Sequence, residues 1–391
     1  MKPGTLSPEA CSCSSPFHDL VLAHDLPSAS SVPSKDAPTE ASQRPFIQEL
    51  TRLELRLWME SQGFPAYRAD QVFGWVYQKR VSGFGEMGNL GKKVQQALEQ
   101  NFRMGALETG EEHRSEDGSI KYRFVLEDGR SIESVLMPHT DHFTVCISSQ
   151  VGCAMGCDFC MTGTMGLIRH LSVAEIVMQV LAAGQGLPEG ETIRNIVFMG
   201  MGEPFHNYEN VMRALEVFTD EHGLNLSQRR ITVSTSGLLP AIRRFGRERV
   251  KANLAVSLNG VTDAVRSQLM PVNRAYNLEK LVQACKEYPL ESRKRITFEY
   301  ILMKGVTDSL EDAKALIKLL HGLKFKVNLI PFNESPGSKY RKPEWEQVRA
   351  FQQYLLDRGV VATVRISKGQ DIQGACGQLV ARKPQPEALP A

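Results

Sequence analysis

Six short apolar runs constrain the fold more than any other feature of this sequence. Their ranges are 143–148, 195–200, 230–235, 253–258, 296–301 and 326–331. Most are separated by stretches with a helical pattern of apolar residues, and this repetition predicts a parallel sheet covered by helices. Six units are too few for an eight-stranded barrel, so we expect an α/β fold, a partial (β/α)6 barrel rather than a flat doubly wound sheet. In either fold, functional groups gather at the carboxyl ends of the strands.

Composition and the spacing of apolar residues predict how the rest of the chain is organised. Residues 1–43 are rich in Ser, Pro and Ala, and such a segment cannot bury enough apolar surface to order itself. We therefore expect a disordered tail at 1–43, a small helical domain at 44–105, a β-hairpin linker region at 106–141, the barrel at 142–382 and a second disordered tail at 383–391. The hairpin should turn at Asp128-Gly129. The helical domain should have one apolar face, formed by Ile47, Leu50, Leu53, Leu57 and Trp58.

Charge and hydropathy exclude several classes of protein. Lys+Arg 46 against Asp+Glu 44 gives a formal net charge of +2, so no field of the whole protein indicates a nucleic-acid partner. No run approaches the roughly eighteen apolar residues of a membrane span, and five acidic residues precede the first arginine, Arg44, unlike a transit peptide. We expect a cytoplasmic protein without a membrane partner, whose eight cysteines are thiols. Cys11 and Cys13, in the tail, are interpreted as incidental.

Three cysteines lie together in the stretch "VGCAMGCDFC" at 151–160. Cys153, Cys157 and Cys160 follow the first predicted barrel strand. A tetrahedral zinc site needs a fourth Cys or His, and no second cysteine or histidine pair follows, although His170 is near in sequence. Three thiolates instead suit a [4Fe–4S] cluster with one iron open to a small molecule, because fully protein-bound clusters use four cysteines. Zinc or a simple structural role stays as the alternative.

This loop resembles the C-x-x-x-C-x-x-C motif of radical S-adenosylmethionine (radical SAM) enzymes, including the aromatic Phe159. The resemblance implies a radical SAM barrel that holds one [4Fe–4S] cluster per chain, with S-adenosyl-L-methionine bound at the open iron. The stretch "FMGMGEP" at 198–204 is similar to the segment that contacts the amino group of this cofactor, and Gly202 and Glu203 match it. Taken alone, it predicts only a tight strand-to-helix turn.

Ser172 and Glu175 form a capping box that should begin the next helix.

The motifs in combination are similar to one family within that superfamily. "ESVLMPHTDHFTVCISSQVGCAMGCDFCMTGTMG", "MGMGEP", "RRITVSTSG", "SLNG", "NLIPFN" and "GACGQL" resemble the RNA adenine carbon-2 methyltransferases, the RlmN-like enzymes. The resemblance covers about residues 46–382. It implies methylation of adenosine in 23S ribosomal RNA and of the adenosine beside the anticodon in transfer RNA. Both RNAs are therefore the expected substrates.

The resemblance also implies roles for individual residues. Cys376 would carry a methyl group, and Cys146 would form a disulfide with Cys376 that frees the methylated base. Glu133 would accept a proton. The residues that match the family's cofactor contacts are Gly202, Glu203, Ser234, Ser257, Leu258, Asn259 and Asn333. Asn259 departs from the pattern, because family members commonly have His there.

Basic residues offer phosphate contacts, although solvated helix faces explain them equally well. They are Arg68, Lys79, Arg80, Lys92 and Lys93 in the helical domain, and Arg229, Arg230, Arg243, Arg244, Arg247, Arg249, Arg293, Lys294 and Arg295 in the barrel. We expect a monomer reduced by flavodoxin or ferredoxin. Three rival functions remain: a carbon-8 adenosine methyltransferase of the antibiotic-resistance type, a radical SAM protein activase, and a non-enzymatic iron–sulfur sensor.

Overall fold

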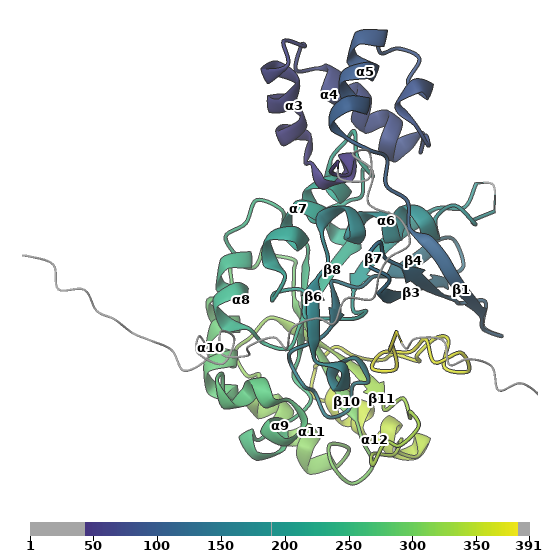
Figure 1. The fold of residues 1–391 in the computed structure, drawn as a ribbon. Coiled ribbons are helices and arrows are strands. Elements are labelled where there is room, and N and C mark those ends of the chain that lie inside the picture. Colours follow the sequence, from purple (N-terminus) through teal and green to yellow (C-terminus); the bar gives the residue numbers. More distant parts are fainter. Residues whose placement is uncertain (1–43, 189, 382–391) are drawn as a thin grey trace, which may run out of the picture. The chain divides into compact units, whose positions relative to one another are not determined.

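The computed structural model describes residues 44–188 and 190–381, so the predicted tails at 1–43 and 383–391, with Cys11 and Cys13, lie outside the described residues. Its main element is a ten-stranded sheet in the order β1-β2-β3-β4-β7-β8-β9-β10-β11-β12 (Figure 1). Seven of these strands pair in parallel. They are β4 (Phe143–Cys146), β7 (Ile193–Phe198), β8 (Ile231–Thr235), β9 (Asn253–Ser257), β10 (Ile296–Leu302), β11 (Phe325–Pro331) and β12 (Ala362–Val364). The six predicted strands and the α/β partial barrel are confirmed.

The first three strands of the sheet run antiparallel. They are β1 (Glu108–Arg114), β2 (Ile120–Val125) and β3 (Ser131–Pro138), and the predicted turn at Asp128-Gly129 joins β2 to β3. β3 pairs with β4, so this hairpin extends the barrel sheet. The sequence pattern does not indicate β1, because its residues, ETGEEHR, are polar and almost all exposed, and they show no apolar alternation.

Helices follow most of the parallel strands and lie outside them (Figure 1). They are α6 (Val173–Ala183), α7 (Tyr208–Thr219), α8 (Leu239–Phe245), α9 (Asp263–Leu269), α10 (Leu278–Glu287), α11 (Leu310–Leu319) and α12 (Trp345–Leu356). The predicted capping box of Ser172 and Glu175 does begin α6. Shorter elements are β5 (Gln150–Gly152), β6 (Leu167–His170), η4 (Thr162–Met165), η5 (Gln228–Arg230) and η6 (Pro271–Arg274).

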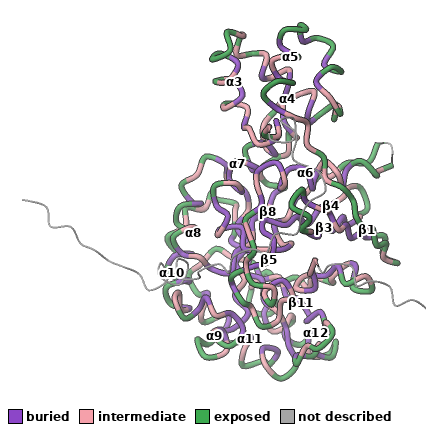
Figure 2. Tube along the Cα trace, in the orientation of Figure 1, coloured by how far each residue is buried: buried purple, intermediate pink, exposed green. Residues whose placement is uncertain are grey.

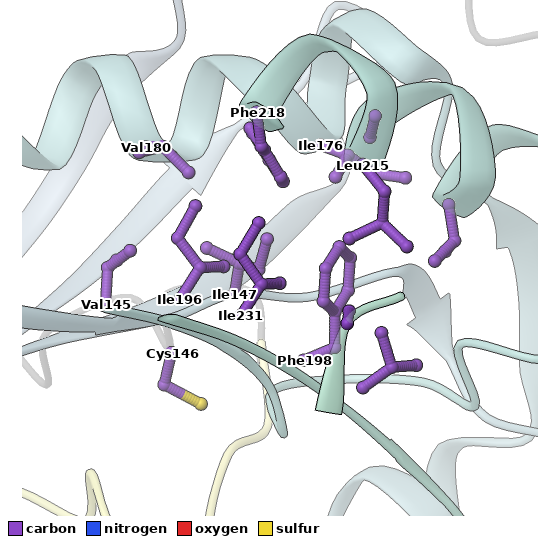
Figure 3. Packing of buried hydrophobic residues seen from close by; sticks show 14 of the residues in the cluster. Val145, Cys146, Ile147, Ile176, Val180, Ile196, Phe198, Leu215, Phe218 and Ile231 are labelled. Atoms are coloured by element: carbon purple, nitrogen blue, oxygen red, sulfur yellow. The ribbon is translucent and has the colours of Figure 1, made fainter. Parts of the chain in front are cut away.

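The alternation of side chains along the strands separates the core from the barrel interior. Figure 3 shows Val145 and Ile147 on the side of the helices, whereas the sulfur of Cys146 points to the other side. The next strand repeats the pattern, because Ile196 and Phe198 are buried against the helices while Val197 lines the interior. Successive strand residues point to opposite faces, so each second residue is available to a site inside the barrel. Figure 2 shows buried residues along the strands and the inner sides of the helices.

A small helical domain precedes the sheet. Its elements are η1 (Ile47–Glu49), α3 (Arg52–Ser61), α4 (Arg68–Phe73), the π-helical η2 (Gly74–Gln78), η3 (Phe84–Glu86) and α5 (Lys92–Asn101). The predicted apolar face is wrong for Leu53 and Leu57, which are 65% and 58% exposed, while Leu55 and Met59 are buried. The reason is where the helix begins. Thr51 caps α3, so Ile47 and Leu50 lie before the helix and do not share its helical period.

Polar contacts join this helical domain to the barrel. Arg52 Nε forms an ion pair with Asp220 Oδ2 at 2.7 Å, and Arg213 donates to the carbonyl oxygen of Glu49 at 2.6 Å. Arg80 likewise donates to the carbonyl oxygen of Gly184 at 2.9 Å. Within residues 44–188 and 190–381, no helix combines the length and the apolarity that crossing a bilayer requires.

Candidate active site

The cysteine loop lies after β4 and between β5 and β6. Cys153, Cys157 and Cys160 line a cavity of about 160 Å³, called here the cysteine-loop cavity. Burial raises the pKa of Cys153 to about 12, so its thiol is neutral unless a cation stabilises the thiolate. In the described residues, no three His, Cys, Asp or Glu side chains converge on a single ion. A cubane cluster does not require such convergence, because each cysteine binds a different iron.

Two other segments brace this loop. Asp158 accepts a hydrogen bond from the Tyr340 hydroxyl at 2.5 Å and forms an ion pair with Lys339 at 2.6 Å. Met161 N donates to the carbonyl oxygen of Gly377 at 2.8 Å, next to Cys376. The loop is therefore tied directly to the C-terminal segment that carries Cys376.

The end of β7 forms one wall of the cysteine-loop cavity. Gly202 has a φ of +101°, which L side chains rarely adopt, and a Cβ at Gly200 would lie 2.6 Å from the carbonyl oxygen of Ile147. Glu203 is buried, and its carboxylate accepts from the backbone N–H of Ser236 at 2.7 Å and of Phe205 at 3.1 Å. Burial raises the pKa of Glu203, and these N–H groups oppose the shift.

The ends of later strands supply polar groups to the same cavity. Of the predicted cofactor residues, those lining it are Gly202, Glu203, Ser234, Ser257, Asn259 and Asn333. Leu258 is fully buried and does not line it; its backbone N–H donates to the carbonyl oxygen of Glu299. Asn259 Oδ1 accepts from the Ile301 N–H at 3.1 Å, so this side chain holds the backbone of β10.

Unsatisfied acceptors remain in this cavity. Ser236 Oγ and Asn333 Oδ1 are buried and have no hydrogen-bond partner. Because a buried polar atom without a partner costs free energy, these atoms favour a polar ligand there. Asn333 is itself held in place, since its Nδ2 donates to the carbonyl oxygen of Cys376 at 3.1 Å.

Arg266, from α9, is a positioning residue that no sequence motif indicates. Its side chain is fully buried and donates to the carbonyl oxygens of Ser236 at 2.6 Å and Leu258 at 3.0 Å. Burial lowers the pKa of Arg266 to about 10, so it stays charged at neutral pH. It fixes the ends of β8 and β9, but an arginine in a short amphipathic helix carries no sequence signal for this role.

A second, larger cavity of about 500 Å³ lies beside the first within the barrel. We call it the basic cavity, because Arg229, Arg230, Lys326, Arg365 and Lys368 line it. Cys146 also lines it, and Cys376 lines both cavities. Both cysteines are free thiols. Burial first, and then the proximity of Cys376, raise the pKa of Cys146 to about 12.

Glu133 is on β3, two residues before the cavity-lining Val135 and therefore on the same side of the strand. Its carboxylate does not line either cavity. It forms an ion pair with Lys121 at 3.3 Å and accepts from the Val380 N–H at 2.9 Å. Burial raises the pKa of Glu133 despite Lys121, which suits a proton acceptor. The C-terminal segment beyond Cys376 thus covers it.

Three groups of the predicted phosphate-binding residues lie in different places. Arg229 and Arg230 line the basic cavity, whereas Arg243 and Arg244 form ion pairs with Glu287 and Glu209 on exposed helix surfaces. In the helical domain, Lys79 lies over the Trp75 ring at 3.9 Å. Only the first group is placed beside Cys146 and Cys376.

Comparison with known proteins decides the family. The model of the radical SAM superfamily matches residues 147–320, and that of the ribosomal RNA large subunit methyltransferase N-terminal domain matches 47–104. The "Dual-specificity RNA methyltransferase RlmN" of Syntrophotalea carbinolica is 50% identical, with coverage of 88% of this chain and 92% of the relative. The chain belongs to the RlmN family. The RlmN of Geobacter sulfurreducens is 49% identical, over 85% of this chain and 91% of the relative.

A solved structure agrees with this assignment. The crystal structure of a radical SAM methyltransferase from Sphaerobacter thermophilus has a TM-score of 0.82 and 46% identity, covering 86% of this chain and 100% of that one. As a member of the RlmN family, the chain is a radical SAM methyltransferase, which implies S-adenosyl-L-methionine and a [4Fe–4S] cluster. The cysteine-loop cavity fits them, because it combines three thiols, the buried carboxylate of Glu203, and buried acceptors without partners.

Proposed function

We propose that this chain methylates carbon 2 of adenosine in 23S ribosomal RNA and in transfer RNA, where the target lies beside the anticodon, through a methylated Cys376. The observation that carries the proposal is that Cys376 lines both cavities. A group held on its sulfur would be reachable from the cysteine loop on one side and from the basic cavity on the other. The names of the RlmN relatives, which describe dual-specificity RNA methyltransferases, support the two classes of RNA.

The cysteine-loop cavity would hold the cofactors. Cys153, Cys157 and Cys160 would bind one cluster per chain, and the cofactor-facing residues would be Gly202, Glu203, Ser234, Ser257, Asn259 and Asn333, with Leu258 contributing only its backbone. When bound, the cluster and S-adenosyl-L-methionine supply an electron, a methyl group and a hydrogen-abstracting adenosyl radical. Carbon 2 of adenine requires radical chemistry, because it is electrophilic and has no lone pair to attack a methyl group.

The chain's own residues would carry and release the new group. Cys376 Sγ would hold the methyl group as a thioether. After one hydrogen atom has been removed from this group, its carbon would bond to carbon 2 of adenine, and the ring would carry the unpaired electron. Carbon 2 would then lose its proton to Glu133 and the adduct would lose one electron, for which the oxidised cluster would be the acceptor. Cys146 Sγ attacks Cys376 Sγ, so a disulfide forms and the sulfur–carbon bond breaks. The electron pair stays on the carbon, which gains a proton to become the methyl group.

The basic cavity would admit the RNA. A base must leave its stack to reach Cys376, and a single-stranded or loop adenosine does so at the lowest cost. Arg229 and Arg230 line this cavity and would contact phosphates near the extruded base. We further propose a monomeric enzyme that receives electrons from flavodoxin or ferredoxin.

The test uses anaerobically reconstituted full-length protein, dithionite, S-adenosyl-L-methionine and transcripts of 23S RNA fragments and transfer RNA. Chromatography of the digested nucleosides separates the carbon-2 from the carbon-8 product. We expect carbon-2 methyladenosine from the wild type, none from Cys376→Ala, and protein covalently attached to RNA from Cys146→Ala. Cys285→Ala is the matched control, because Cys285 is a buried thiol outside both cavities. A carbon-8 product, or full activity of Cys376→Ala, would contradict the proposal.

A further inference from the structure

A row of polar side chains crosses three neighbouring strands inside the barrel. The registers of β10, β11 and β12 place Glu299 beside Asn328, and Asn328 beside Thr363. Asn328 Nδ2 donates to Glu299 Oε1 at 2.9 Å, and Thr363 Oγ1 donates to Asn328 Oδ1 at 2.7 Å. These two hydrogen bonds fix the orientation of the Glu299 carboxylate.

The second oxygen of this carboxylate has no partner. Glu299 is only 4% exposed, its Oε2 is buried without a hydrogen bond, and no cation among the described residues forms an ion pair with it. A buried carboxylate oxygen left in this state is costly, so native proteins rarely keep one unless a ligand satisfies it. Glu299 has no part in the chemistry proposed above. Its unpaired oxygen therefore needs another explanation.

Glu299 lies at the junction of the two cavities. Together with Cys376 and Met199, it lines both of them. Arg365 lines the basic cavity together with Glu299, Cys376 and Cys146. Cys376 first, and also Glu299 and Cys146, raise the pKa of Arg365, while burial opposes the shift. The carboxylate thus faces the same space as the two cysteines.

The edge of adenine that carries carbon 2 also carries a hydrogen-bond donor. The exocyclic amino group, ring nitrogen 1 and carbon 2 follow one another along this edge. A base that presents carbon 2 to Cys376 therefore presents its amino group to the same wall of the cavity. We propose that Glu299 Oε2 accepts a hydrogen bond from the exocyclic amino group of the target adenine, and so selects adenine and directs carbon 2 toward Cys376. This inference rests on the proposed function.

The adenine of S-adenosyl-L-methionine has the same exocyclic amino group, so it is the other group that can donate to Glu299 Oε2. Asn328 favours the target base, because it holds Glu299 from the side of the basic cavity and does not line the cysteine-loop cavity. In hypoxanthine, the base of inosine, an oxygen acceptor replaces the amino group. It would face the carboxylate oxygen and be rejected. Glu299 would thus discriminate by both attraction and repulsion.

The test compares three RNAs that carry adenosine, purine riboside or inosine at the target position, with wild type and Glu299→Gln. In Glu299→Gln, the amide oxygen keeps the bond from Asn328, so the amide nitrogen replaces Oε2 and donates instead of accepting. We expect kcat/KM for adenosine RNA to fall about 10- to 100-fold, the range for one hydrogen bond to a charged group. We expect no further loss for purine riboside RNA, and a gain for inosine RNA relative to wild type. Glu311→Gln, an exposed carboxylate on α11, is the matched control.

Methylation of Cys376 without RNA, read from the mass of the intact protein, separates the two sources of the amino group. We expect Glu299→Gln to methylate Cys376 as the wild type does. Slower Cys376 methylation, or an equal loss for adenosine and purine riboside RNAs, would overturn the proposal in favour of a cofactor or structural role. If the wild type makes the carbon-8 product, the proposed function fails, while the comparison of adenosine, purine riboside and inosine still reports on Glu299.

Discussion

Replacing Arg266 with methionine removes a buried cation that fixes the ends of two barrel strands. The guanidinium donates to Ser236 O, Leu258 O and Asn273 Oδ1 at 2.6, 3.0 and 2.9 Å. Methionine fills much of the same volume but donates nothing, so both carbonyl oxygens lose a partner in a site without solvent. Since Ser236 lines the cysteine-loop cavity, this change acts on stability and on the ligand site together.

The expected loss in the free energy of unfolding follows from two opposing contributions. Each hydrogen bond to a charged group contributes about 1.5–3 kcal/mol, so the three bonds give roughly 5–9 kcal/mol. Removing the cation also relieves the cost of burying it, which is several kcal/mol per ion. The difference leaves an expected loss of about 2–4 kcal/mol in the free energy of unfolding.

Urea unfolding followed by circular dichroism at neutral pH measures this loss. Arg274→Met is the matched control, because Arg274 is exposed in the neighbouring η6, and we expect it to change stability by no more than about 0.5 kcal/mol. The binding of S-adenosyl-L-methionine to the reconstituted protein should weaken in Arg266→Met only. A loss below about 1 kcal/mol in Arg266→Met would refute the reasoning, because the three hydrogen bonds would then be balanced by the cost of burial.

Two further predictions address burial. Leu55→Ala should cost about 2–5 kcal/mol of stability and Leu53→Ala no more than about 0.5, because only Leu55 faces the core of the helical domain; equal losses in urea unfolding would contradict that orientation. Burial raises the pKa of Glu299 above the ordinary glutamate value, so the folded state binds its proton more tightly than the unfolded state does. The stability that Glu299 contributes by holding this proton is complete when the pH is below the ordinary glutamate pKa. It is lost as the pH rises through the raised pKa of the folded state. Glu299→Gln should therefore gain stability relative to wild type over this interval, and a pH-independent difference in thermal unfolding would argue against it.

The barrel strands could be predicted because each repeats a local pattern. The runs at 195–200 and 326–331 are apolar, short and followed by Gly or Pro and polar residues, and a buried parallel strand requires this composition. The spacing of Cys153, Cys157 and Cys160 is local in the same sense. Candidate ligand residues such as Ser234 and Asn333 follow from strand order, since the carboxyl ends of parallel strands meet at one edge.

What the sequence did not reveal depends on register and on distant segments. Glu299 meets Asn328 only because β10 and β11 pair in one register, and no local pattern encodes that pairing. Arg266 reaches Ser236, thirty residues earlier in the chain, through a turn between β9 and α9. The error at Leu53 and Leu57 arose because a capping residue at Thr51 resets the helical phase, which an apolar repeat read across it cannot show.

The C-terminal segment connects three parts of the site that lie far apart in sequence. Met161 N and Thr162 Oγ1, in the cysteine loop, donate to the carbonyl oxygens of Gly377 and Leu379, and Val380 N donates to Glu133 Oε2. Cys376 begins this segment, so a displacement that moved its sulfur toward a bound base would also strain the bond that covers Glu133. A carboxylate already accepting from Lys121 and Val380 is a weaker base than one released from Val380. If Glu133 is the proton acceptor proposed above, proton removal would therefore be coupled to the position of Cys376 through one short stretch of backbone.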